Sequence, residues 1–195
     1  MALRNILPES DPTLSKKSRD IKEFNNRLHI LLDDMRQTLI EANGLGLAAP
    51  QVGVLRRAVI IVDTSIDSEN VEDQIIELIN PTLTNATGVQ KGTEGCLSLP
   101  GLYGIVERPN YVEITAQDRH GKNITYSGEE IVARAICHEI DHLNGLMFTK
   151  LAEKILTEEE LEELRAEIEA NRHDSKIDSE TDNEIDIKAE EEEMQ

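Results

Sequence analysis

Aromatic residues are scarce in this 195-residue sequence, which contains three Tyr, two Phe and no Trp. A hydrophobic core must therefore be built from aliphatic side chains, chiefly those of Ile, Leu and Val. The scarcity also excludes an aromatic platform of the kind on which single-stranded nucleic acids stack. A chain of this length corresponds to about one ordinary domain and buries roughly two thirds of its unfolded surface, so a substantial core is available.

Cysteines are also few, and long apolar runs are missing. Cys96 and Cys137 are too few for a disulfide framework, which favours a reducing compartment and leaves both as free thiols or metal ligands. No segment approaches the ~18 apolar residues of a membrane helix, and the first residues lack the apolar stretch of a signal peptide. We expect a soluble protein that is not exported by such a signal.

Positive charge is in deficit, and the formal net charge is -19. Residues 153–195 contain 18 acidic and 5 basic residues, so most of the excess negative charge lies there. An acidic surface repels phosphate groups, which argues against nucleic acid or anionic lipid as the main partner. Residues 173–195 contain few apolar side chains, and we expect them to form a disordered tail.

Hydrophobic periodicity predicts a helix followed by several strands. Apolar residues three and four positions apart run from Ile21 to Ile40 and predict an amphipathic helix that ends near Asn43 and Gly44. The segment GLGLAAPQVG, residues 44–53, is too broken for a helix and too apolar for a solvated loop, so we expect a buried loop. Four segments predict strands, the last two as a hairpin: RRAVIIVD (56–63), ELINP (77–81), YVEITAQD (111–118) and NITYS (123–127).

Two later helix starts have the pattern of a capping box, in which Ser or Thr is followed three residues later by Glu. Residues 127–130 predict a helix that ends at Gly145, because an Asn-Gly pair favours a helix end. Residues 157–160 predict a second, highly charged helix that runs to about Arg172.

The helix predicted to end at Gly145 contains the motif HEIDH at residues 138–142. Residues four apart lie one turn apart on the same face of a helix, so His138 and His142 can bind one metal ion together. Glu139 is displaced by about 100° around the helix axis, which places its carboxylate beside the open position of the ion. That place suits a general base better than a ligand.

A catalytic site of this type needs a third protein ligand, whose source distinguishes the classes of enzyme. One group of zinc peptidases uses a His six residues after the second His, but this sequence has Phe148 there. Another group uses a Glu from a later helix, where composition alone already accounts for Glu159, Glu162 and Glu163. The remaining candidates are Cys96, Cys137, His29, His120 and His173.

Three segments in this order resemble the peptide deformylase family: GLGLAAPQVG (44–53), EGCLSLPG (94–101) and HEIDHLNG (138–145). The resemblance extends in pattern over about residues 1–155. It implies that Cys96 is the third metal ligand beside His138 and His142, and that Glu139 is the catalytic carboxylate. The implied fold is α+β, with antiparallel sheets packed around a central helix that carries HEIDH and with N-terminal and C-terminal helices.

The same resemblance assigns roles at the substrate. Gln51 matches a side-chain donor to the oxyanion, and Leu97 matches the residue whose backbone N–H joins it. Gly46 matches a backbone contact to the substrate peptide. We expect the aliphatic side chains of Leu45, Leu97 and Ile131, together with Ala135, to surround a methionine side chain.

The implied reaction removes the N-formyl group from the N-terminal methionine of newly synthesised polypeptides and releases formate. A thiolate and two imidazoles suit Fe(II), Zn(II), Ni(II) or Co(II), and the resemblance implies one Fe(II) per chain. The implied partners are N-formylmethionyl nascent chains and, transiently, the ribosome, in a bacterial-type cytoplasm. We expect no membrane partner and no direct contact with nucleic acid.

The expected domain organisation is a catalytic domain at residues 1–155, a charged helix at 156–172 and the acidic tail at 173–195. Two positions depart from patterns seen in the family. Tyr103 stands where some members have Arg, which affects substrate contacts on that side, whereas Cys137 before the first metal His leaves the chemistry intact. The alternative is a metallopeptidase of the HExxH type, with a Glu ligand from residues 158–163.

Overall fold

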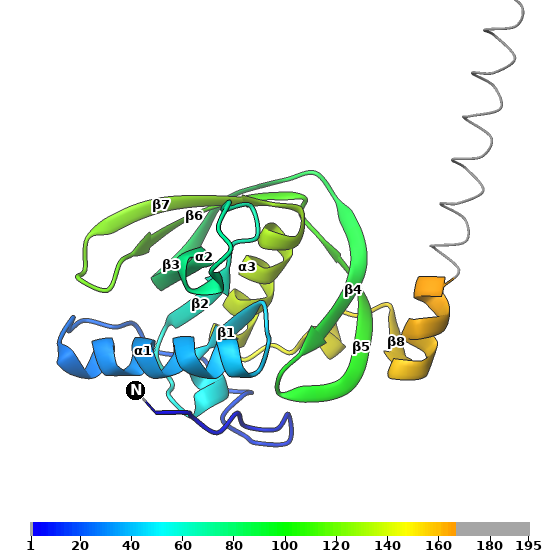
Figure 1. Ribbon diagram of the computed structural model, residues 1–195, viewed down its shortest axis with the longest axis horizontal. Helices are drawn as coiled ribbons and strands as arrows, with labels where there is room; N and C mark the ends of the chain where they lie inside the picture. Colours follow the sequence, from blue (N-terminus) through cyan, green and yellow to red (C-terminus); the bar gives the residue numbers. More distant parts are fainter. Residues whose placement is uncertain (1, 167–195) are drawn as a thin grey trace, which may run out of the picture. The chain divides into compact units, whose positions relative to one another are not determined.

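The computed structural model describes residues 2–166 of the chain. The chain divides into two compact units, Met1–Ile155 and Leu156–Gln195. The first unit contains helices α1 to α3 and strands β1 to β7, whose course Figure 1 shows. None of the helices within residues 2–166 has the length and apolar character needed to cross a lipid bilayer.

Helix α1, Asn26–Glu41, begins later than the predicted start at Ile21, so that part of the prediction is wrong. The side chain of Asn25 accepts hydrogen bonds from two backbone N–H groups and caps the first turn. The backbone N–H and carbonyl of Ile21 are both bonded to the side chain of Asn80 instead. The side chain of Ile21 packs in the core, which explains an apolar residue at this position outside the helix. The predicted helix end near Asn43 is confirmed.

Most of the segment 44–53 is buried as predicted, although Leu45 and Gly53 are exposed, and it is more regular than a loop. Gly46–Ala48 forms strand β1, and Ala49–Val52 forms the 3-10 turn η1. Residues 47–52 are all buried. Gly53 ends the turn with a φ of 80°, in the left-handed region that favours glycine.

A five-stranded antiparallel sheet of order β1-β2-β3-β6-β7 runs through the first unit. Its other strands confirm the four predicted ones: β2 is Ala58–Val62, β3 is Ile75–Thr87, β6 is Tyr111–Gln117 and β7 is Asn123–Glu129. Strand β3 continues past Pro81 because the register shifts between Ile79 and Thr82, and such an irregularity tolerates a residue without an N–H. The short helix α2, Val71–Gln74, precedes β3.

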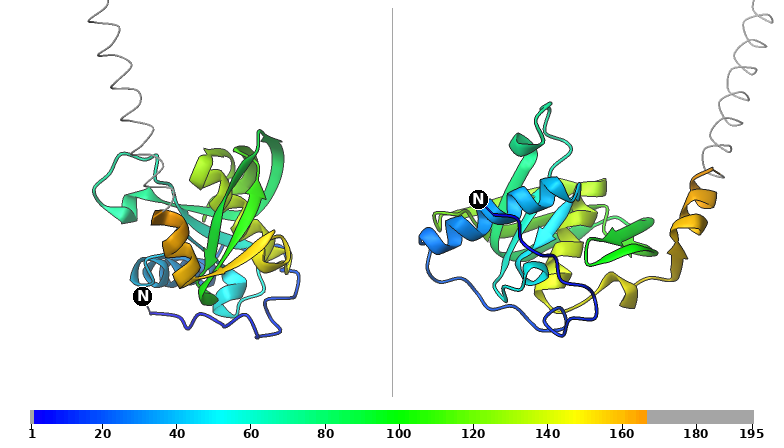
Figure 2. Two further views of the ribbon diagram at one scale, coloured as in Figure 1. Left: turned by 90° about the vertical axis from the view of Figure 1, so that its right-hand side faces the viewer. Right: turned by 60° about the horizontal axis from the view of Figure 1, so that its bottom comes forward.

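Helices α1 and α3 cover opposite faces of this sheet. Successive residues of β2 point to opposite faces, and the whole strand is buried. Ile60 belongs to the cluster that includes Leu32 of α1, whereas Ile61 belongs to the cluster that includes Ile136 of α3, Glu130–Leu143. Both clusters are aliphatic, as the scarcity of aromatic residues predicts. Figure 2 shows the helices from two further directions.

Helix α3 begins at Glu130, and the capping box predicted at Ser127 is wrong. Strand β7 continues to Glu129, so Ser127 is a strand residue paired with β6. The N-cap residue Glu129 makes no capping hydrogen bond with its side chain. The predicted helix end is confirmed, with Asn144 as the C-cap and Gly145 in the left-handed region.

Two strands that the sequence pattern does not predict, β4 (Gln90–Cys96) and β5 (Leu99–Arg108), form a hairpin. Glycines at 92, 95, 101 and 104 interrupt the alternation of apolar residues that would reveal these strands. The second sheet has the order β4-β5-β8, and the boundary of the first unit falls within β8, Lys154–Thr157. In Figure 1, α3 lies between the five-stranded sheet and the β4–β5 hairpin.

In the second unit, residues 158–166 are helical. The N–H of Glu160 donates to Oγ1 of Thr157 at 3.3 Å, and the N–H of Thr157 donates to the carboxylate of Glu160 at 2.8 Å. This reciprocal pair is the predicted capping box. The predicted end of the helix at Arg172 and the tail predicted at residues 173–195 lie outside the described residues.

Gly145 closes α3 where a side chain does not fit. Its φ is +74°, and a Cβ would lie 2.7 Å from the backbone carbonyl of Ser15. Gly101 has a φ of +75° but open space around its Cβ position. We expect Gly101→Ala to lower the free energy of unfolding by roughly 1–2 kcal/mol through backbone strain, and Gly145→Ala to lower it further because of the clash. Chemical denaturation measures both losses, and equal values would contradict the steric explanation.

Candidate metal centre

Helix α3 and the end of strand β4 bring three side chains of metal-ligand type together. His138 and His142 are both buried, with ring centroids 4.9 Å apart. Cys96 is half-buried and places its Sγ 3.3 Å from Nε2 of His142. The sulfur and one nitrogen of each imidazole all lie within 4.8 Å of one another. In the part of the chain that the structure describes, these are the Cys, His and carboxylate groups close enough to share an ion.

The chemistry of the three groups suits a divalent metal ion. A thiolate and two imidazoles form a donor set typical of zinc and of the neighbouring transition metals. Nδ1 of His138 is already bonded to Glu94 at 3.0 Å, which leaves the other ring nitrogen for an ion. Three protein ligands also leave one position of a tetrahedral site open, as catalysis requires. The residues therefore fit a catalytic metal centre.

The other candidates for the third ligand do not join this group in the described residues. His29 on α1 and His120 in the β6–β7 turn contact each other edge to face, with ring centroids 5.3 Å apart. Cys137 is half-buried on α3, where burial raises the pKa of its thiol to about 11. His173 lies outside the described residues. Three predicted alternatives are exposed side chains of the second unit: Glu159, Glu162 and Glu163.

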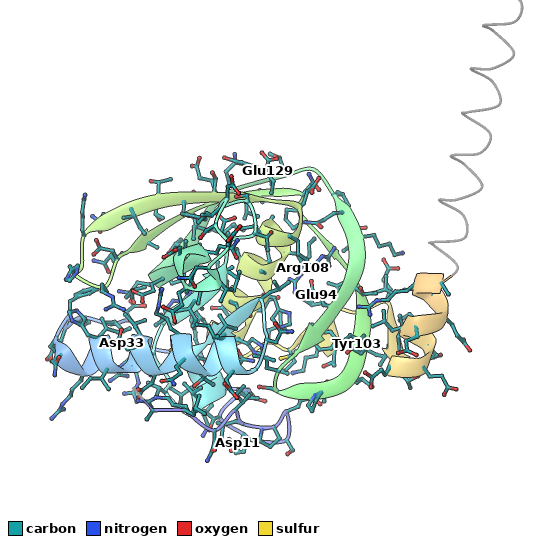
Figure 3. All side chains as sticks on the ribbon, viewed as in Figure 1. Asp11, Asp33, Glu94, Tyr103, Arg108 and Glu129 are labelled. Atoms are coloured by element: carbon teal, nitrogen blue, oxygen red, sulfur yellow. The ribbon has the colours of Figure 1, made fainter. Side chains whose placement is uncertain are left out.

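Glu94 is a site residue that the sequence motifs do not reveal. Its carboxylate accepts two hydrogen bonds from Arg108, at 2.8 and 3.0 Å, one from Arg134 at 2.9 Å, and contacts Nδ1 of His138. Burial would raise the pKa of this carboxyl, but the hydrogen bonds from His138 and Arg108 outweigh burial and lower it to about 2. The charged carboxylate thus orients the His138 ring. Figure 3 labels Glu94 and Arg108 beside α3.

Glu139 follows His138 on α3 and keeps one carboxylate oxygen unsatisfied. The residue is 4% exposed, and Oε2 has no hydrogen-bond partner among the described residues. Burial raises the pKa of the carboxyl to about 7, against the lowering effect of His138. Strand β1 approaches so closely that a Cβ on Gly46 would lie 2.8 Å from the carboxyl carbon. Because a buried polar atom without a partner is unfavourable, Oε2 indicates a place for a polar group from outside the chain.

The side-chain amide of Gln51 points at the sulfur of Cys96. Its Oε1 accepts the N–H of Ala48 at 2.8 Å, which identifies the other terminal atom as the NH₂ group. That group lies 3.5 Å from Sγ of Cys96 and 3.3 Å from Oγ of Ser98. Leu97 directly follows Cys96, and its side chain packs on the α1 core. Gln51 and Leu97 both adjoin the centre, and their oxyanion roles stay predictions.

The residues predicted to bind substrate fall on β1, beside it and at the start of α3. Gly46 begins β1, an edge strand of the five-stranded sheet. Leu45 and Ile131 expose 44% and 43% of their surface, so apolar side chains are available to a ligand at both positions. Their contact with a methionine side chain stays a prediction.

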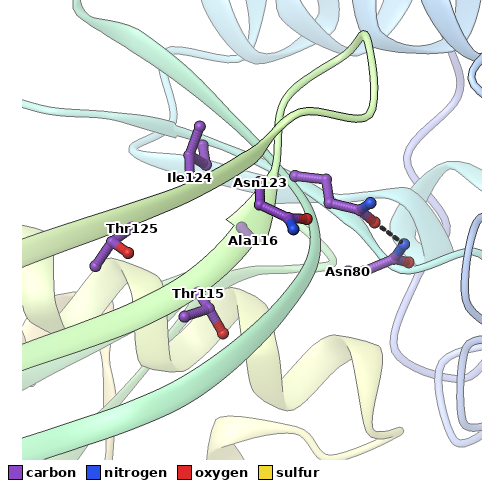
Figure 4. A pocket seen from close by; sticks show the side chains of 7 residues that line it. Asn80, Thr115, Ala116, Asn123, Ile124 and Thr125 are labelled. Carbon is purple, nitrogen blue, oxygen red and sulfur yellow. Dashed lines mark hydrogen bonds between the residues drawn. The ribbon is translucent and has the colours of Figure 1, made fainter.

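A separate hollow of about 480 Å³ lies on the five-stranded sheet beside the β3 irregularity, as Figure 4 shows. Two of its polar side chains are already hydrogen-bonded, since the amide of Asn80 donates to Gln117 and the amide of Gln117 donates to the carbonyl of Gly121. None of the predicted site residues lines this hollow. It is therefore distinct from the metal centre.

Residues 3–157 match the sequence model of the polypeptide deformylase family. The peptide deformylase of Alkaliphilus metalliredigens is 49% identical over 158 residues, which cover 81% of this chain and 100% of that protein. A crystal structure of a peptide deformylase from Legionella pneumophila is 35% identical with a TM-score of 0.71, covering 88% of this chain and 96% of that one.

A crystal structure of a class I type b peptide deformylase from Acinetobacter baumannii with Met-Ala-Ser bound is also similar. It is 28% identical with a TM-score of 0.70 and covers 77% of this chain and 98% of that one. These matches extend over the residues that form the metal centre, and they agree in sequence and in three-dimensional structure. The chain belongs to the peptide deformylase family.

Proposed function

We propose that this protein hydrolyses the formamide group of N-formylmethionyl polypeptides at the centre formed by Cys96, His138 and His142. The approach of Cys96 Sγ to Nε2 of His142 at 3.3 Å carries the proposal, because it completes a three-ligand site beside Glu139. The reaction breaks the bond between the formyl carbon and the methionine nitrogen, adds the elements of water and yields formate and a free amino terminus.

Cys96, His138 and His142 would hold one divalent ion, for which we propose Fe(II), while Zn(II), Ni(II) and Co(II) suit the same donors. When bound, such an ion polarises a carbonyl group and lowers the pKa of water toward 7. Glu94 supports the site by accepting a hydrogen bond from Nδ1 of His138, which fixes the tautomer of the ring and the direction of its other nitrogen.

Glu139 is the residue to which we assign proton transfer. A pKa of about 7 lies near neutral pH, where one carboxyl group can accept a proton from water and return it to the leaving nitrogen. An exposed Glu, with a pKa near 4.3, would be a much weaker base. Burial of Glu139 therefore supports its role directly. The unsatisfied Oε2 is the atom available for this transfer.

To Gln51 and Leu97 we assign stabilisation of the negative charge that develops on the formyl oxygen. The bond between Oε1 of Gln51 and the N–H of Ala48 holds the amide in one orientation, with its NH₂ group beside Cys96 and Ser98. The backbone N–H of Leu97 belongs to the turn between β4 and β5, next to the Cys96 ligand. Together these two donors would form an oxyanion hole.

The substrate peptide would bind along β1, because an edge strand offers unpaired backbone groups to an extended peptide. Gly46 lies on this strand, and the apolar side chains of Leu45, Leu97 and Ile131 would surround the methionine. The Met-Ala-Ser peptide bound to the A. baumannii enzyme supports an N-terminal methionine as the ligand of this fold.

We also propose that the protein acts in the bacterial cytoplasm and meets its substrates near the ribosome. The bacterial source of the similar deformylases supports the first point. The chemistry of the substrate supports the second, because formylated termini belong to newly synthesised chains.

Replacement of Cys96 tests the ligand set. Cys96→Ala should lose the metal, because a site with two histidines lacks the third ligand that a catalytic ion needs. Cys137→Ala is the matched control, since Cys137 is the second cysteine and lies on the same helix as both histidines. Elemental analysis after purification without oxygen measures occupancy and identifies the ion. Full occupancy in Cys96→Ala would remove this residue from the site.

Replacement of Glu139 separates chemistry from metal binding. Glu139→Ala should retain the metal but lose turnover by about 100-fold or more, because the carboxylate moves protons and does not coordinate. Metal content and kcat should be measured on one preparation. Loss of metal in this variant would show that Glu139 is a ligand, contrary to the role proposed.

Substrate choice tests the function itself. Formyl-Met-Ala should react, whereas acetyl-Met-Ala should react more slowly by about 100-fold or more, because an added methyl displaces the oxyanion from its donors. Formate and new amines should be measured separately, with a longer unblocked peptide as a third substrate. Cleavage of internal peptide bonds without formate would instead establish the metallopeptidase alternative.

A further inference from the structure

Strand β4 and helix α3 face each other through two matched rows of residues. Residues 90, 92, 94 and 96 recur with the period of a strand face, and residues 130, 134, 138 and 142 with the period of a helix face. Two residues along a strand span about 6.7 Å, and four along a helix span about 6 Å. The two rows therefore stay in step over the length of the contact.

A hydrogen bond or close contact joins the rows at each step: Gln90 with Glu130 (2.6 Å), Gly92 with Arg134 (3.3 Å), Glu94 with His138 (3.0 Å) and Cys96 with His142 (3.3 Å). The last two steps contain the three metal ligands. The distance between the thiolate and the imidazoles therefore depends on the register between the strand and the helix.

Arg134 makes the contacts that fix this register. Its side chain is 6% exposed and lies one turn before His138 on α3. The guanidinium donates to the main-chain carbonyls of both hairpin strands and to the carboxylate that orients His138, with these acceptors: Gln90, Gly92, Glu94 and Val106. One side chain thus joins the metal-binding helix to β4 and β5 together.

Two neighbours define what Arg134 contributes. Arg108 also joins the hairpin to α3, because it lies on β5 and binds Asp141 as well as Glu94, but its side-chain hydrogen bonds go to carboxylates and not to main-chain carbonyls. Gly92 provides the space, because a Cβ there would lie 3.2 Å from Nη2 of Arg134. The absence of a side chain at 92 lets the guanidinium reach the strand.

We propose that Arg134 is a positioning residue for the metal centre: it holds β4 in register with α3 and so sets the distance between Cys96 and the two histidines. This inference rests on the metal site of the proposed function. Arg108 already donates to both oxygens of Glu94, so hydrogen bonding of that carboxylate alone does not require a second arginine. The bonds to main-chain carbonyls are what Arg134 adds.

Co(II) binding tests the proposal with a readout independent of activity. Arg134→Met removes the donors and keeps an apolar stem, and we expect Co(II) affinity to fall roughly 10- to 100-fold, as for other residues that support metal ligands. The absorption band of the thiolate–cobalt bond should weaken as well. Affinity should be measured by competition with a chelator, below the melting temperature of each variant, so that a loss of stability alone does not change it.

Arg36→Met is the matched control, because Arg36 also extends from a helix to two main-chain carbonyls, those of Glu72 and Ile75. Its Co(II) affinity and thiolate band should equal those of the wild type. The proposal would be overturned if Arg134→Met bound Co(II) with an affinity within about twofold of the wild type and showed an unchanged thiolate–cobalt band. If Arg134→Met does not fold, Arg134→Lys keeps the charge without the planar fork and is judged by the same criterion.

Gly92→Ala tests the same contact by a substitution on strand β4. The added methyl should push the guanidinium by a few tenths of an ångström and weaken Co(II) binding, but it should have no effect once Arg134 is Met. Fully additive effects of the two substitutions would contradict the proposal. Failure of the wild type to bind Co(II) through Cys96 would refute the proposed metal site itself, whereas normal binding by both wild type and Arg134→Met refutes only the role of Arg134.

Discussion

The geometry of the candidate metal centre depends on the hydrogen bonds and ion pairs of the buried Glu94 carboxylate. An unpaired charge in a protein interior is unfavourable by several kcal/mol, so Glu94 is stable only where cationic and hydrogen-bonding partners surround it. Arg108, Arg134 and His138 supply those partners from β5 and α3. Loss of one partner of such a group typically costs about 3–5 kcal/mol, a large share of the roughly 5–15 kcal/mol that stabilises a whole domain. The β4–β5 hairpin is therefore attached to α3 by electrostatics where it presents Cys96.

The five-stranded sheet supplies the rigidity that this attachment needs. Aliphatic clusters lie on both faces of β2, and Val132, Ile136 and Leu143 fix α3 against one of them. His138 and His142 are buried on the same helix. Because the apolar side of α3 cannot rotate without opening a core, the two imidazoles keep a constant direction. Apolar packing thus orients the helix, and the Glu94 network orients the strand that meets it.

The sequence predicts well those features that depend on local spacing. The HEIDH motif places two histidines on one helix face, the Asn-Gly pair ends that helix, and apolar segments bounded by polar residues identify four strands of the larger sheet. The sequence predicts poorly those features that depend on distant partners. Asn80 binds the backbone of Ile21, which therefore lies before helix α1 and not in it. Strand β7 includes Ser127, where the sequence pattern predicts the start of a helix. Residue chemistry alone leaves several candidates for the third metal ligand. Cys96 reaches His142 because it lies at the end of the β4–β5 hairpin, and the glycines in that hairpin hide its strands from a pattern-based prediction. Once β4 is recognised, Glu94 falls on the same face as Cys96, two residues earlier.

Stability and chemistry are in opposition at the carboxylate of Glu139. Leaving its Oε2 buried and unpartnered is unfavourable by about 1–3 kcal/mol, and the close approach of Gly46 leaves no room for a side chain there that could pair with it. The same burial raises the pKa of Glu139 to about 7, which supports the role of a base that we propose for it. A partner from within the chain would remove the strain but would also lower that pKa and occupy the place where substrate must bind. The rigid sheet and the paired charges around Glu94 allow the fold to keep Oε2 unsatisfied, so in the function that we propose its polar partner would come from the reaction.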